Sequence, residues 1–112
     1  MRIAIPVAMN RLSPHFGHAE SFALINVDKN KGEIGEARFL TAPDHQPGLL
    51  PAWLKQEGAD LVIAGGMGMR AKDIFKQNGI EVVVGAGGGT PEEIVKAYLA
   101  GKLETGDNIC DH

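Results

Sequence analysis

Residues 61–70, LVIAGGMGMR, decide the fold that this sequence predicts. Leu61, Val62 and Ile63 are branched and apolar without alternation, which is typical of a parallel strand covered on both faces. Three glycines then lead into a helical pattern, so we expect a strand that feeds a helix through a tight turn. Such a turn lets a ligand approach the backbone closely, and the first amides of the helix would favour an anion there.

The glycines of this turn are candidates for ligand contact because they leave the backbone accessible. A second glycine-rich segment, residues 85–89, follows the apolar run 82–84 and would form an equivalent turn. Glycines at such turns can also serve tight packing alone, and the sequence leaves that alternative open. The candidate ligand-binding residues of the two turns are Gly65, Gly66, Met67, Gly68, Arg70, Gly87 and Gly88.

The spacing of Gly66, Gly68 and Ala71 also fits the G-x-G-x-x-A fingerprint of dinucleotide-binding folds. That fingerprint needs an acidic residue at the end of the next strand, where it holds a ribose. The run 82–84 continues into Gly85 and Ala86 instead, so the match is weak.

The chain has 112 residues, which fit one domain over residues 1–101 and a polar tail over residues 102–112. Its net charge is −3 with scattered Lys and Arg, so the composition excludes a nucleic-acid footprint. No apolar run is long enough to span a membrane, and the N-terminal segment lacks the apolar core of a signal peptide. We therefore expect a cytoplasmic protein with no membrane contact. The single cysteine, Cys110, rules out an internal disulfide.

Three strands are expected before the first helix. Residues 3–7 are short and apolar, and residues 22–28 and 34–40 are typical of a hairpin closed at Asn30-Lys31-Gly32. The first strand and this hairpin predict an antiparallel meander.

Three helices follow, alternating with the two remaining strands, 61–64 and 82–84. Gly58 and Gly101 would end the first and the third helix. The third begins with a capping box of Thr90 and Glu93 around Pro91. The expected buried stripes are Leu50, Trp53 and Leu54; Ala71, Ile74 and Phe75; and Ile94, Val95, Tyr98 and Leu99.

This order predicts an α/β fold with three layers, α/β/α, around a mixed five-stranded sheet whose second strand is antiparallel. With the first strand central and the fourth beside it, the strand order is 3-2-1-4-5. Right-handed crossovers make the fourth and fifth strands parallel to the first. The loops after the first, third, fourth and fifth strands would then share one edge of the sheet, where a switch point forms a ligand crevice. These loops contain residues 13–18, His45, residues 65–70 and residues 85–90.

The same edge would collect candidate metal ligands. His15 and His18 lie three residues apart in a loop, and two imidazoles could bind a borderline metal, although hydrogen bonding within the loop is the alternative. His45 lies between two prolines. The tail adds Cys110 and His112, and its eleven residues could span about 36 Å when extended, far enough to return to this edge.

Several segments together resemble the dinitrogenase iron-molybdenum cofactor biosynthesis family, the NifX/NafY-like accessory domain that also occurs as small stand-alone proteins and in the molybdenum-copper orange protein. The resemblance covers nearly the entire chain and implies a ribonuclease H-like fold and the binding or carriage of a metal–sulfur cluster or its precursor, without catalysis. Exposed histidine and cysteine would hold the cluster, which points to His15, His18, His45, Cys110 and His112. The segments are SPHFGHA after the IAIPV strand, H-x-P-G before the first helix, DLVIAGGMGMRA, G-x-x-x-G-T-P-E-E and LAGKL.

The leading hypothesis is therefore a non-catalytic binding or carrier protein for an iron–sulfur or molybdenum-containing (Mo-Fe-S or Mo-Cu-S) cluster. It would exchange this cluster with donor and acceptor proteins, as a monomer or weak homodimer. The alternative is a small binding module for a divalent metal ion or a phosphate-bearing ligand. An enzyme is disfavoured, because the first strand offers no carboxylate to hold Mg²⁺ for a nuclease and nothing fixes Cys110 and His112 as a nucleophile pair.

Overall fold

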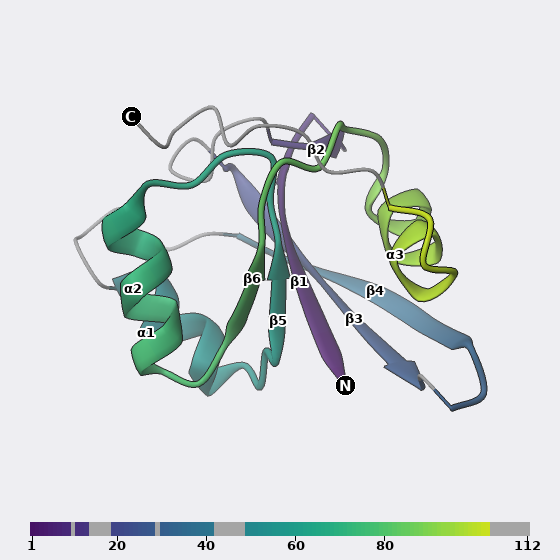
Figure 1. Ribbon diagram of the computed structural model, residues 1–112, viewed down its shortest axis with the longest axis horizontal. Coiled ribbons are helices and arrows are strands. Elements are labelled where there is room, and N and C mark those ends of the chain that lie inside the picture. The colour runs from purple at the N-terminus through teal and green to yellow at the C-terminus, as the bar shows by residue number, and fades with distance from the viewer. Residues whose placement is uncertain (10, 14–18, 29, 42–48, 104–112) are drawn as a thin grey trace.

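The computed structural model describes residues 1–9, 11–13, 19–28, 30–41 and 49–103 (Figure 1). Strands and helices alternate along the second half of the chain, as the sequence predicted. The elements are β1 (Arg2–Ala8), β2 (Arg11–Leu12), β3 (Ser21–Asp28), β4 (Glu33–Thr41), α1 (Leu49–Gln56), β5 (Leu61–Ile63), α2 (Met69–Gln77), β6 (Glu81–Val83) and α3 (Pro91–Leu99).

The sheet has the strand order β4-β3-β1-β5-β6, which confirms the predicted order 3-2-1-4-5. β1 pairs with β5 in parallel and β5 with β6 in parallel, whereas β3 is antiparallel to both of its neighbours. The C-terminal ends of β1, β5 and β6 therefore meet at one edge, and the β3–β4 hairpin points toward the opposite edge (Figure 1).

The sequence did not predict β2, which pairs antiparallel with the end of β1 through Val7 and Leu12. Two residues are too short to show a hydrophobic period, so this segment resembled an ordinary polar loop. The chain reverses at Met9, whose φ of 54° is uncommon for a residue other than glycine.

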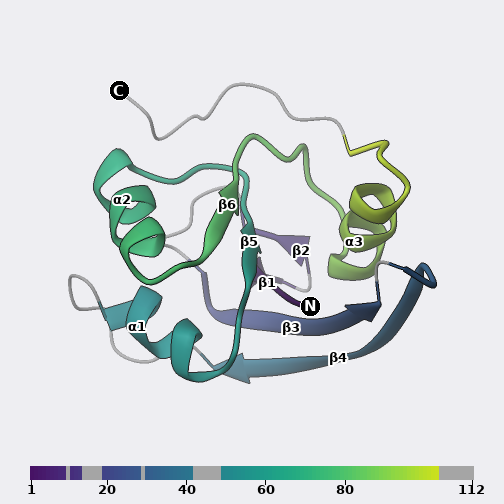
Figure 2. The same cartoon turned by 60° about the horizontal axis from the view of Figure 1, so that its bottom comes forward.

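Helices cover both faces of the sheet, as predicted. α1 and α2 lie together on one face and α3 lies on the other (Figure 2). β1 is buried on both faces: Ile3 and Ile5 join the core cluster under α3, and Ala4 joins the cluster under α1 and α2. Phe75 is the deepest α2 residue in the second cluster, and Ile94 and Val95 fill the first. Burial on both faces explains why these strands lack polar alternation.

All three helices end in the same way, with a glycine in the left-handed region. Gly58, Gly79 and Gly101 have φ angles of 84°, 74° and 70°. After each glycine, the next amide donates to a carbonyl in the last helical turn, as from Ile80 to Phe75 at 3.0 Å. This is the Schellman arrangement, and it confirms Gly58 and Gly101 as helix ends. At Gly58 and Gly79, this helix ending also directs the chain into the strand that follows, β5 or β6.

Some of the predicted stripes are only partly buried. Ile74, Tyr98 and Leu99 are half-buried, and Trp53 packs edge-on against Phe22 with ring centroids 5.7 Å apart. Within the described ranges, no helix has the length and apolar composition needed to cross a membrane.

Candidate functional site

Backbone hydrogen bonds join the turns after β1, β5 and β6 at one edge of the sheet. Gly85 N donates to Gly65 O at 2.8 Å, and Leu12 N donates to Gly89 O at 2.9 Å. We call residues 64–68 and 84–90, with Leu12 and Ser13, the glycine-rich edge. The prediction that the loops after the first, fourth and fifth strands share an edge is confirmed. Residues 42–48, which follow β4, lie outside the described residues.

The turn after β5 passes from the core to the surface over a few residues. Gly65 and Gly66 are buried, and the Met67 side chain, 1% exposed, packs in the core under α1 and α2. Gly68 is half-buried and Arg70 is exposed in the first turn of α2. Of the residues proposed for this turn, Gly68 and Arg70 are therefore the ones that reach the surface.

The amino end of α2 has no side-chain cap among the described residues. Its N-cap residue is Gly68, with φ −67° and ψ 154°, a conformation that any amino acid adopts. A Cβ atom built on Gly68 would have nothing within 4 Å, and the same is true of Gly87, whose φ also lies outside the left-handed region. The fold itself does not require glycine at these two positions. Both leave room for a group that approaches the backbone from outside.

The amino end of α3 is capped by its own side chains. Glu93 N donates to Thr90 Oγ1 at 3.3 Å, and Thr90 N donates to Glu93 Oε1 at 3.1 Å, which confirms the predicted capping box. These two bonds occupy the positions that an external anion would use. The sequence predicted ligand contacts at both turns, but the amino end of α3 is occupied by its own cap and offers few free donors to a ligand.

The capping box also holds the pKa of Glu93 below its ordinary value of 4.5. The largest cause is the hydrogen bond from the Thr90 backbone amide, followed by the bond from the Thr90 hydroxyl and then by the nearby charges of Arg11 and Lys96. A carboxylate therefore stands at this helix end at neutral pH, which further disfavours a second anion there.

The three other glycines of the second turn have a structural reason to be glycine. Gly85, Gly88 and Gly89 have φ angles of 85°, 118° and 121°, which side-chain-bearing residues rarely adopt. The exposed Gly88 thus serves the turn whether or not a ligand is bound.

The predicted metal ligands His15, His18, His45, Cys110 and His112 lie outside the described residues. The described chain nevertheless fixes where the segment with His15 and His18 starts and ends. The buried Ser13 donates its amide to Pro6 O at 2.9 Å, and Glu20 N donates to Val7 O at 2.9 Å, so both ends lie beside the last residues of β1. Within the part of the chain that is described, no three His, Cys, Asp or Glu side chains form a metal-binding group.

The sequence contained one distinction between the turns that we did not use. Gly68 stands at the N-cap of α2 and Thr90 at the N-cap of α3, and only threonine can cap with its side chain. Comparing the residues at these two positions would have predicted that α3 has a side-chain cap and that α2 has none.

The strand order, the three layers and the hydrogen-bonded turns define a small α/β domain with its accessible backbone at the switch-point edge. The chain belongs to the dinitrogenase iron-molybdenum cofactor family, whose model matches residues 1–101.

Individual relatives are similar to this chain over nearly its whole length. The uncharacterized protein MJ0580 of Methanocaldococcus jannaschii is 38% identical over 109 residues, covering 93% of this chain and 90% of that protein. The crystal structure of PH0822 has a TM-score of 0.86 and 31% identity, with 94% of both chains covered. The apo form of the orange protein from Desulfovibrio gigas has a TM-score of 0.69 and 22% identity, covering 96% of this chain and 93% of that one. At this low identity, the similarity to the orange protein shows only that the two proteins share a fold.

Proposed function

We propose that this protein binds and carries an anionic metal–sulfur cluster or its precursor, of the iron–sulfur or molybdenum-containing (Mo-Fe-S or Mo-Cu-S) kind, and does not catalyse a reaction. Membership of the iron-molybdenum cofactor family supports the cargo class. The observation on which the proposal rests is the amino end of α2, which has no side-chain cap among the described residues and is entered through Gly68.

Hydrogen-bond donors without a formal charge suit a thiometallate cargo. The first amides of α2 point toward the edge, and the helix dipole adds partial positive charge at the same end. Gly68 and Gly87 would let the cargo approach the backbone, and the Arg70 guanidinium would add one positive charge beside it. Such binding is reversible, as a carrier requires.

Side chains from the segments that flank the edge would complete the metal coordination. His15 and His18 belong to the segment that starts and ends beside β1, and His45 to the segment after β4. Cys110 and His112 would be supplied by the tail. Imidazole and thiolate suit iron, copper and other borderline or soft metals. Release to an acceptor protein would then need only the exchange of a few ligands.

Anaerobic reconstitution with iron, sulfide and molybdate tests this function. After desalting, the wild-type protein should retain charge-transfer absorbance with stoichiometric metal and acid-labile sulfide. Arg70→Ala should retain several-fold less. Lys31→Ala removes the same charge from the β3–β4 turn at the opposite edge, so this variant should match the wild type.

Two results would count against the carrier. One is desalted protein without metal or sulfide. The other is calorimetric binding of inorganic phosphate or Zn²⁺ that is as tight as the binding of the cluster, which would favour the small binding module instead.

A further inference from the structure

Among the described residues, β6 is an edge strand, and no described strand pairs with its outer side. In the described part of the sheet, the strand order ends at β6. Glu81 N donates to Asp60 O at 3.1 Å, and Val83 O accepts from Ala64 N at 2.8 Å. Because a parallel strand bonds its neighbour through alternate residues, the backbone N–H and C=O of Val82 point away from β5. Gly85 N continues the pattern toward Gly65 O, so the backbone of Val84 also points outward. An edge of this kind can accept another strand.

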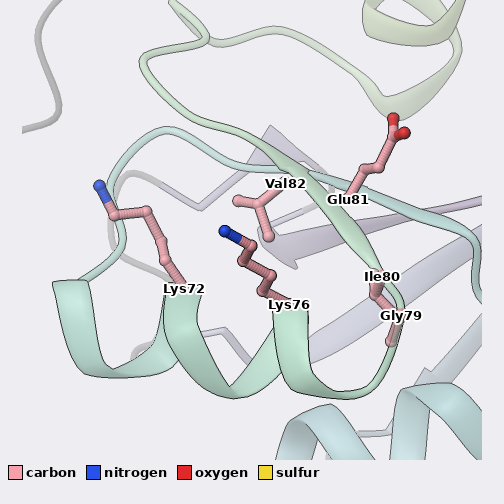
Figure 3. Close-up of a pocket in the computed structure, with 6 residues that line it drawn as sticks. All are labelled: Lys72, Lys76, Gly79, Ile80, Glu81 and Val82. Carbon is pink, nitrogen blue, oxygen red and sulfur yellow. The ribbon is translucent and has the colours of Figure 1, made fainter.

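A shallow open pocket of about 570 Å³ lies along this edge, between β6 and α2 (Figure 3). Ile80 and Val82 supply its apolar part, and both pack into the core under α1 and α2. Lys72 and Lys76 of α2 line the pocket, whereas the Glu81 side chain points away from both lysines (Figure 3). The pocket therefore combines an apolar base, positive charge and a strand edge.

The spacing of the two lysines matches the spacing of an added strand. Lys72 and Lys76 are four residues apart on one helix, which separates them by about 6 Å along the axis. Alternate residues of an extended chain repeat every 6.6 Å or so, on one face of the strand. Carboxylates at alternate positions of a strand paired with β6 would thus lie opposite the two ammonium groups. An apolar residue could contact Ile80 and Val82.

We propose that β6 is the docking site for an extended, acidic segment of a partner protein, which adds to the sheet as a further strand. The backbone of Val82 and Val84 would provide the pairing, and Lys72 and Lys76 would select carboxylates at alternate positions. A second copy of this chain is the less favourable occupant. Pairing two copies of β6 about a twofold axis would bring both lysine pairs onto neighbouring helices, where like charges repel. The site adjoins the glycine-rich edge at Val84, but its pairing groups and lysines need no cargo.

The test uses the full chain and a fluorescein-labelled peptide of alternating Glu and Val, (Glu-Val)₄. Fluorescence anisotropy should show saturable binding, with amide chemical-shift changes at Val82 and Val84. The alternating Lys and Val peptide should bind at least tenfold more weakly.

Two substitutions separate strand pairing from simple charge attraction. Val82→Pro removes the outward N–H and is compatible with an edge strand, so it should weaken binding tenfold or more. Val82→Ala shortens the same side chain but keeps the N–H, so it is the matched control and should bind much more tightly than Val82→Pro. Lys76→Glu should do the same, Lys76→Arg should preserve binding, and Lys31→Glu on the far hairpin should have no effect.

Two outcomes overturn the proposal. Binding that responds to Lys76→Glu but not to a folded Val82→Pro would mean electrostatic attraction without strand addition. No saturable binding, or self-association of the chain that Val82→Pro abolishes, would mean that β6 does not receive an acidic partner strand.

Discussion

Two glycines, one at each end of α2, separate the needs of the fold from those of the cargo. Gly79 has a φ of 74°, so its helix end requires a residue that tolerates the left-handed region. Gly68 has a φ of −67° and open space where a side chain would begin. We therefore assign the first glycine to stability and the second to binding.

Gly68→Ala should therefore leave the fold intact and impair cargo binding. Alanine adopts the local conformation without strain and reduces the freedom of the unfolded chain, but it is a poorer N-cap residue than glycine. These effects oppose each other, so the free energy of unfolding should change by less than about 1 kcal/mol. The alanine methyl group would obstruct the approach to the α2 amides, and cluster retention should fall several-fold. Urea unfolding and reconstitution, each on the same preparation, measure the two effects.

Gly79→Ala provides the matched control for this substitution. Forcing alanine into the left-handed region should reduce the free energy of unfolding by about 1–2 kcal/mol, while cluster retention at a temperature where the protein is folded should not change. Equal retention by Gly68→Ala and the wild type would show that the cargo does not approach this glycine.

At the scale of elements, the capping box makes the stability of the protein depend on pH in the acidic range. The pKa of Glu93 is lower in the folded protein than its ordinary value of 4.5. The carboxylate therefore stabilises the folded state above pH 4.5, and this contribution is lost as the pH falls through the lowered folded pKa. Glu93→Gln keeps an acceptor but cannot titrate.

The stability difference between the wild type and Glu93→Gln should thus be constant above about pH 5, a little above the ordinary carboxyl pKa. Below that pH, the difference should shrink as the wild type loses its carboxylate. Urea unfolding of both proteins between pH 3 and 7 measures it. A difference that does not vary with pH would mean that the carboxylate contributes nothing as a charge.

Elements with strong local signals could be predicted from the sequence. The glycine endings of α1 and α3 and the cap of α3 depend on residues within one turn, which a sequence displays directly. β2 could not be predicted, because its two residues are held by pairing with β1 and by the bond from Leu12 to Gly89. Those contacts come from distant parts of the chain.

At the scale of the molecule, right-handed crossovers predicted the parallel direction of the last two strands, and the strand order followed from taking the first strand as central. The roles of the residues within the glycine-rich turn were harder to assign, because burial there depends on packing. Met67 was a ligand candidate from its sequence position, yet its side chain fills the core under α1 and α2. The docking edge at β6 was not recognised from the sequence. The predicted strand order already placed this strand last, but the pocket that Lys72, Lys76 and Val82 line exists only in the folded chain.

The two cores on either face of the sheet should determine global stability. Phe75 is fully buried under α1 and α2, so Phe75→Ala should cost about 3–5 kcal/mol, a large part of the 5–15 kcal/mol or so that stabilises a typical domain. Met69, six residues earlier and 57% exposed, provides the contrast: Met69→Ala should change the free energy of unfolding by less than about 0.5 kcal/mol. Thermal and urea unfolding of the two variants measure these changes in the free energy of unfolding. Similar costs for the two would contradict the assigned packing.

The most direct test of the central claim is metal and acid-labile sulfide analysis, with a visible spectrum, of protein purified anaerobically from a host that makes such clusters. The account predicts stoichiometric iron, molybdenum or copper together with sulfide, and less of both in Gly68→Ala. Colourless, metal-free protein that also fails to be reconstituted with iron, sulfide and molybdate would contradict it.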